Sequence, residues 1–306
     1  MTTRRTAAVL AGIGVLLFLI GVPFPGSLPA HAAQEPEWDT RPLSHWIRAF
    51  GAPATRSDAS RALAGIATRD GGAAIRSALP ILIESLAADV ADVRIESANL
   101  LALMGPPATD AVPRLASLFR EDESPRVRLQ AGLALASIAP DDAAVVEASA
   151  GALRDADVEV RRTAAALLVQ ARDAAAPATA AIAAARGDED PLVRLFAAAA
   201  QGQLGDTAAA REGLLEALAD DDPVVRSEAA WQLGAALPPG ERTRVIQPLT
   251  AALRDPDARV RLAAADALAT IGRPARPAVD TLWTLVRDPD ESVRSGALRA
   301  IKAIKD

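Results

Sequence analysis

The sequence predicts an all-α solenoid of about eight helical hairpins. A unit of about 33 residues recurs along the chain, and apolar residues inside each unit follow the helical period. Alanine, the residue with the highest helix propensity, supplies about a quarter of the chain. A chain of 306 residues is long for one compact core, whereas stacked repeats share a continuous one.

Residues 1–32 have the order of a secretory signal peptide. Arg4 and Arg5 precede an apolar run over residues 7–22, and a Pro/Gly-rich stretch then leads to Ala30-His31-Ala32. We expect cleavage after Ala32, which changes the net charge from −6 to −8 and sends the chain to the periplasm or outside the cell. The alternative is an uncleaved membrane anchor, although this run is shorter than the ~20 residues of an ordinary span.

Residues 33–72 read as a degenerate N-terminal capping unit, and residues 73–306 as seven repeats. The segment Pro42-LSHWIRAF-Gly51 resembles a first helix, and a second-helix spacing follows it at Arg56, Ala59, Leu63 and Ile66. We expect four aromatic residues to lie in the core or in an end cap: Trp38, Trp46, Phe50 and Trp283.

A Val-Arg pair marks each of the seven repeats. Its arginines are Arg94, Arg128, Arg161, Arg194, Arg226, Arg261 and Arg294, at successive separations of 34, 33, 33, 32, 35 and 33 residues. In five repeats an aspartate lies six and four residues before the arginine. The second aspartate of each pair is expected to be a helix N-cap, because its carboxylate can accept bonds from free backbone amides.

Apolar and small residues follow the arginine on one helical face. In the clearest copy, Arg261-LAAADALATIG, they lie at helical spacing and the copy ends at Gly272, which suits the left-handed turn at a helix end. A second apolar-periodic segment precedes each aspartate pair. Each repeat is therefore expected to be a helix, a tight turn, a second helix and a loop.

The pattern D-x-D-x-x-V-R-x-x-A-A-x-A-L-x-x-I-G resembles the HEAT repeat, in particular the HEAT-like repeats of phycobilisome lyases. The match covers residues 73–304 and implies an armadillo-like superhelix. The resemblance also implies that aspartates and arginines form a ladder of hydrogen bonds between successive repeats. It assigns this role to the seven arginines together with Asp157, Asp190, Asp222, Asp257 and Asp290.

Composition and motifs argue against a catalytic or metal site. The chain has no cysteine and two histidines, and it lacks P-loop, G-x-S-x-G and H-E-x-x-H motifs. Its acidic balance argues against nucleic-acid binding. We therefore expect no enzyme activity, no cofactor and no metal, and contact with a membrane only through an uncleaved N-terminal segment.

Binding of a protein partner is the function that remains. Helical phase directs the positions one, two, five and nine residues after the arginine away from the core. The bulky residues at these positions are Leu133, Leu195, Phe196 and Trp231. We expect this strip to line the concave side of the solenoid and to bind a protein segment. Two alternatives stay open: a chromophore-lyase-like or other modifying enzyme on the same scaffold, and a purely structural envelope component.

Overall fold

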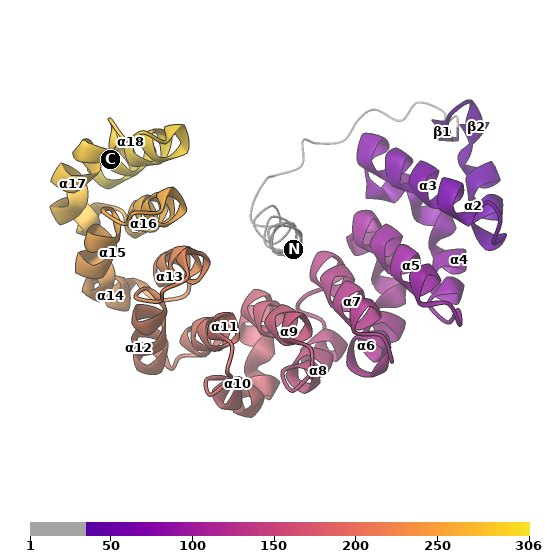
Figure 1. Ribbon diagram of the computed structural model, residues 1–306, viewed down its shortest axis with the longest axis horizontal. Coiled ribbons are helices and arrows are strands. Elements are labelled where there is room, and N and C mark those ends of the chain that lie inside the picture. Colours follow the sequence, from indigo (N-terminus) through magenta and orange to yellow (C-terminus); the bar gives the residue numbers. More distant parts are fainter. Residues whose placement is uncertain (1–34) are drawn as a thin grey trace. The chain divides into compact units, whose positions relative to one another are not determined.

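The computed structural model describes residues 35–306, which fall into two units: unit 1 ends at Ala78, and unit 2 comprises Leu79–Asp306. The predicted signal peptide lies outside the described residues. Over the described part of the chain, helices dominate and strands are confined to one two-residue pair. The prediction of an all-α solenoid of helical hairpins is confirmed (Figure 1).

Unit 1 is a helical hairpin with a small antiparallel ribbon at its start. Its elements are β1 (Glu37–Trp38), β2 (Arg41–Pro42), α2 (Leu43–Gly51), α3 (Arg56–Asp70) and the 3-10 helix η1 (Gly72–Ala78). The Glu35 carboxylate accepts bonds from the backbone N–H and the hydroxyl of Ser44, which ties the start of α2 to the preceding segment. Trp46 and Phe50 are buried, as predicted.

Unit 2 is a stack of seven hairpins, one for each repeat. Its first helices are α4 (Leu79–Ser85), α6 (Val112–Glu121), α8 (Ala143–Ala152), α10 (Thr179–Ala185), α12 (Thr207–Ala217), α15 (Ile246–Ala252) and α17 (Val279–Leu285). Its second helices are α5 (Ala91–Met104), α7 (Pro125–Ile138), α9 (Val158–Ala171), α11 (Pro191–Gln203), α13 (Pro223–Ala235), α16 (Ala258–Ile271) and α18 (Glu291–Lys305).

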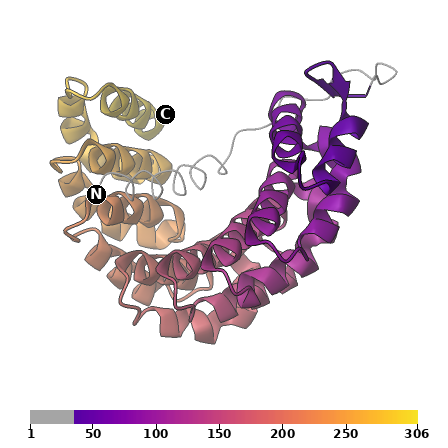
Figure 2. The ribbon, with the colours of Figure 1, turned by 45° about the vertical axis from the view of Figure 1, so that its right-hand side comes forward.

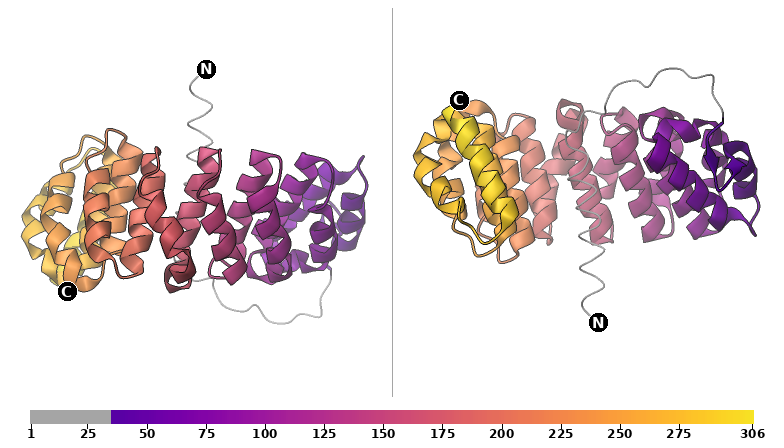
Figure 3. Two further views of the ribbon diagram at one scale, coloured as in Figure 1. Left: turned by 90° about the horizontal axis from the view of Figure 1, so that it is seen from below. Right: turned by 90° about the horizontal axis from the view of Figure 1, so that it is seen from above.

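Short helical segments lead into several of the first helices of unit 2. They are η2 (Pro106–Ala111), η3 (Arg172–Ala178), α14 (Pro239–Arg242), η4 (Thr243–Val245) and η5 (Arg273–Ala278). Unit 2 is thus built of two layers of helices (Figure 2). Within each layer, successive helices stand side by side along the stack (Figure 3). The second helices lie on the inner side of its curve (Figure 1).

The helical period of each repeat places its small and apolar residues in the core. In α16, for example, Val260, Ala264 and Leu268 are fully buried, as their spacing predicts. The helix ends at Gly272, whose φ of 72° lies in the region that glycine adopts without strain. Because all three side chains are small or slender, neighbouring helices can approach closely.

Consecutive second helices pack against one another along unit 2, with one exception. Helix α11 packs well against α9, and α13 packs well against α16, but α11 and α13 make little direct contact. Helix α12 contacts both of them and joins the stack at this step. The step between α11 and α13 is therefore the loosest junction between second helices in unit 2.

Candidate functional site

The second aspartate of each pair is a helix N-cap, as predicted. The carboxylates of Asp157, Asp190, Asp222, Asp257 and Asp290 each accept a bond from backbone N–H groups in the first turn of the following helix. Asp222, for example, accepts from Val224 N at 2.8 Å. In the first repeat, Val90 lies at the N-cap position of the second helix, α5, which therefore has no side-chain cap.

The ladder between repeats uses the first aspartate of each pair, which corrects the assignment of this role to the second. The ion pairs are Arg94–Asp122, Arg128–Asp155, Arg161–Asp188, Arg226–Asp255 and Arg261–Asp288. The carboxylates of Asp157, Asp222, Asp257 and Asp290 instead accept from backbone N–H groups at their own helix N-termini. The first aspartate faces the preceding repeat.

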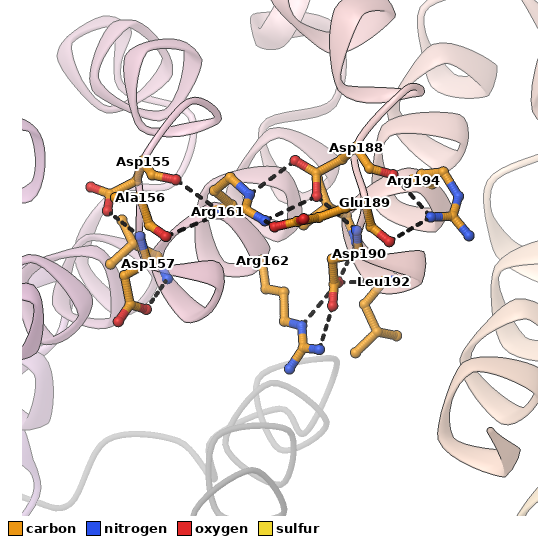
Figure 4. Close-up of polar contacts among 12 residues, drawn as sticks. Asp155, Ala156, Asp157, Arg161, Arg162, Asp188, Glu189, Asp190, Leu192 and Arg194 are labelled. Atoms are coloured by element: carbon orange, nitrogen blue, oxygen red, sulfur yellow. Dashed lines mark hydrogen bonds and ion pairs between the residues drawn. The ribbon is translucent and has the colours of Figure 1, made fainter.

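Each of these five arginines bonds to two repeats at once, as Figure 4 shows for Arg161. Arg161 donates from Nη1 to the carbonyl oxygen of Asp155 at 3.0 Å, within its own turn. It also donates from Nε and Nη2 to the two carboxylate oxygens of Asp188 in the next turn, at 2.9 and 3.2 Å. This planar fork is the geometry in which an arginine binds a carboxylate most strongly.

The ladder is interrupted at Arg194. Within residues 35–306 its guanidinium donates only to the carbonyl oxygens of Asp188 and Glu189 in its own turn, both at 2.9 Å, so its predicted role between repeats is wrong. Asp220, the next first aspartate, follows Arg194 after 26 residues, whereas bonded pairs lie 27 to 29 residues apart. Arg294, in the last repeat, likewise bonds to carbonyl oxygens of its own turn.

Asp190 is the one second aspartate that also bonds to another repeat. Arg162, on the inner side of α9, donates from Nε to Asp190 at 3.0 Å and from Nη1 to Glu159 at 2.8 Å. Burial acts to raise the pKa of the Asp190 carboxyl, but bonds from Arg162 and from backbone N–H groups outweigh it and hold that pKa below its ordinary value. The carboxylates of Asp190 and Glu159 thereby compensate the positive charge of Arg162.

The predicted strip of bulky residues is only partly exposed. Leu133 and Trp231 are half-buried on the second helices α7 and α13, but Leu195 and Phe196 are only 1% and 8% exposed. These two residues do not form an open patch, because α9 and α12 pack against α11 and cover its flanks. Trp283 was expected in the core or in an end cap, but its side chain is 48% exposed on the first helix α17.

Glu228 lies beside Trp231 on α13, and sequence reasoning gave it no role. The two residues are three positions apart and so share a helix face. Gln232 Nε2 donates to Glu228 Oε1 at 3.0 Å. Desolvation raises the pKa of the Glu228 carboxyl, and the bond from Gln232 only partly offsets this effect. Burial cannot be read from one repeat alone, so the sequence carried no signal for this shift.

Two further findings concern residues 35–306. No helix there combines the length and the apolar character that crossing a bilayer requires. Within the same residues, no three side chains of His, Asp or Glu are grouped so that they could hold a metal ion.

Similarity to known proteins agrees with this architecture. A family model described as HEAT repeats matches residues 145–234 and 211–302. No curated protein is significantly similar to the chain. Among solved structures, an engineered protein is 25% identical, with a TM-score of 0.53 over 86% of this chain and 78% of its own.

Two natural proteins share the fold at lower identity. The Escherichia coli protein YibA is 21% identical, with a TM-score of 0.51 over 85% of this chain and 92% of its own. The phycocyanin lyase complex CpcE–CpcF of Nostoc sp. PCC7120 is 18% identical, with a TM-score of 0.53 over 92% of this chain and 100% of its own. With the repeated Asp–Arg turns, the stacked hairpins and a family match spanning just over half of the sequence, the chain belongs to the HEAT-repeat family.

Proposed function

We propose that this chain is an exported, non-catalytic HEAT-repeat scaffold that binds a protein segment on the inner surface of unit 2. By inner surface we mean the exposed faces of the second helices. The observation that carries the proposal is Trp231, a half-buried tryptophan on the second helix α13. Tryptophans in such positions contribute a disproportionate share of binding energy at protein interfaces.

Charged side chains on the second helices are paired with one another, which favours an apolar partner segment over a highly charged one. Arg162 is bonded to Asp190 and Glu159, and Asp266 on α16 pairs with Arg299 on α18 at 3.2 Å. Beside Trp231, desolvation raises the pKa of the Glu228 carboxyl. With these charges compensated, affinity must come mainly from burial of apolar area on Trp231 and Leu133.

Polar side chains lie between these two anchors. The alanines of α9 and α11 are buried, and the half-exposed positions of the two helices include Arg162, Gln170 and Gln203. A partner segment would therefore meet polar side chains between Leu133 and Trp231. Export of the scaffold is inferred from residues 1–32 alone, and it places this interaction in the cell envelope or outside the cell.

A site-specific photo-crosslinker tests the location of binding. Placed at residue 231 in the intact protein, it is expected to capture one protein from the envelope of the producing cells. The same group at residue 283, a tryptophan position that is exposed on the outer helix α17, is the control. Equal capture from both positions would contradict an inner binding surface.

The captured partner then allows a quantitative test. Trp231→Ala should weaken its binding about tenfold or more, since truncating such an anchor costs ~2 kcal/mol, and should leave the melting temperature nearly unchanged. Trp283→Ala should change neither quantity. A sharp fall in melting temperature of Trp231→Ala, with binding reduced only in proportion to the folded fraction, would show that Trp231 is a packing residue.

A further inference from the structure

Unit 1 contains a hollow of about 640 Å³ that is separate from the inner surface of unit 2. It lies between the turn that joins β1 to β2, the exposed face of α2, and the start of α3. Trp38, Arg41, His45, Trp46, Arg48 and Arg61 are among its lining residues. Pockets of a few hundred cubic ångströms accommodate ligands much larger than a single ion.

Hydrogen bonds and close packing fix the floor of the hollow. Trp46, 7% exposed, donates from Nε1 to the carbonyl oxygen of Trp38 at 3.1 Å. The ring of Trp38 lies against Gly65 of α3, where a β-carbon would overlap it. Arg69 Nη2 donates to the carbonyl oxygen of Glu37 at 2.7 Å. The ribbon and its tryptophan are thereby held against both helices.

Backbone strain is stored at the rim of the hollow. The turn between the two strands consists of Asp39 and Thr40, whose φ angles are 48° and 61°. A two-residue hairpin turn with both φ angles positive favours Asn and Gly, and a β-branched threonine there is strained. Strain of this kind persists where the surrounding structure enforces it and is frequent at binding sites. Here it sets Trp38 and Arg41 opposite each other in the ribbon.

The arginines of the hollow keep unused hydrogen-bond donors. The Arg41 guanidinium lies 5.6 Å from the centre of the Trp46 ring, and its Nη1 is 3.2 Å from His45 Nε2. A guanidinium only donates, so Nε2 is the acceptor in this contact. Arg48, exposed on the same face of α2, has no bonded acceptor within residues 35–306. Arg61 pairs with exposed Asp58 at 3.3 Å.

The balance of charge at the hollow is opposite to that of the chain. Three arginines and two aspartates line it, whereas the whole chain carries a net charge of −6. We propose that this hollow binds an acidic peptide segment, whose carboxylates bond to Arg48 and Arg41 and whose apolar side chains pack on Trp38. Planar guanidinium groups bind carboxylates in a bidentate manner, and tryptophan and arginine are the residue types enriched at the energetic centres of protein interfaces.

Peptide binding to the intact protein tests this proposal. The probe is a short fluorescein-labelled peptide of alternating glutamate and leucine, and its control has glutamine in place of glutamate. The glutamate peptide should bind at least tenfold more tightly, and Arg48→Glu should remove about tenfold of its affinity. Arg76→Glu makes the same charge change at an exposed arginine of unit 1 outside the hollow and should have little effect.

Three outcomes would overturn the proposal. They are equal binding of the two peptides, equal losses in Arg48→Glu and Arg76→Glu, and displacement of the glutamate peptide by polygalacturonate at comparable carboxylate concentration, which would assign an acidic polysaccharide instead. Trp231→Ala, in the other unit, should leave peptide binding unchanged. Failure of the inner surface of unit 2 to bind a partner is thus distinguishable from failure here.

Discussion

At the scale of single residues, the ladder arginines carry the most concentrated set of interactions in unit 2. Arg94 and Arg161 are only 6% and 7% exposed. A charged group so far from water is stable only when its donors are bonded, and removal of one partner costs more than the bond itself contributes. Each arginine–aspartate pair therefore stabilises one particular distance between the turns of two neighbouring repeats.

Arg161→Ala and Arg194→Ala form a matched pair of variants. Both lose bonds to two carbonyl oxygens of their own turn, but only Arg161 also loses two carboxylate partners in the next repeat, Asp188 and Glu189. Arg161→Ala should lower the free energy of unfolding by ~1–3 kcal/mol more than Arg194→Ala does. Urea denaturation followed by circular dichroism measures the difference. Equal losses would show that the ion pairs between repeats do not contribute to stability.

Acid should weaken the capping turns through their aspartates. The bond from Arg259 lowers the pKa of the Asp257 carboxyl from 3.8 to about 2, and the pKa values of Asp255 and Asp288 are also lowered. A carboxyl with a lowered folded-state pKa stabilises the fold above its unfolded pKa, and this contribution is lost as the pH falls through the folded value. The urea midpoint should thus be flat near neutrality and fall between about pH 4 and pH 2.

Asp257→Asn is the control for this pH dependence. Asparagine is also a good N-cap, so the variant keeps the cap and loses the ion pair with Arg259. The stability difference between wild type and variant should be largest above about pH 5 and shrink towards pH 2. A difference that stays constant over this range would contradict the assignment to Asp257.

At the scale of elements, small residues set how closely second helices approach. A β-carbon at Gly234 of α13 would lie 2.8 Å from the Cα and 2.9 Å from the Cβ of Ala267 in α16. Both contacts are below normal packing distance, and one is to the backbone, which cannot rotate away. Close packing of α13 on α16 therefore depends on the absence of a side chain at residue 234.

Gly234→Ala should destabilise unit 2 although it raises helix propensity. Forcing α13 away from α16 is expected to cost ~1–3 kcal/mol. In Gly151→Ala, on the exposed face of α8, the new methyl group meets only Arg120 Cδ at 3.9 Å, so the variant should gain up to ~1 kcal/mol from propensity alone. Thermal melting of both variants compares the two effects. A neutral or stabilising Gly234→Ala would disprove the close approach.

At the scale of the whole molecule, features local to one repeat were predictable and features between repeats were not. The N-cap role of Asp190 follows from the residues around it, and so does the glycine that ends α16. The burial of Phe196 depends on α9 and α12, which the helical phase of α11 cannot reveal. The choice of the first aspartate as ladder partner depends likewise on the distance between turns. One feature of the sequence did indicate the interrupted ladder. The 32 residues between Arg194 and Arg226 are the shortest separation between successive arginines of the Val-Arg pairs, and the ladder is interrupted at this step.

Hydrogen exchange of the intact protein, measured without and with the partner captured at residue 231, tests the central claim most directly. Binding on the inner surface of unit 2 predicts slower exchange in α7, α9, α11 and α13, with exchange in the first helices α10, α12 and α15 unchanged. Protection confined to those first helices, or to the hollow of unit 1, would contradict the account of Trp231 as the anchor of a protein-binding surface.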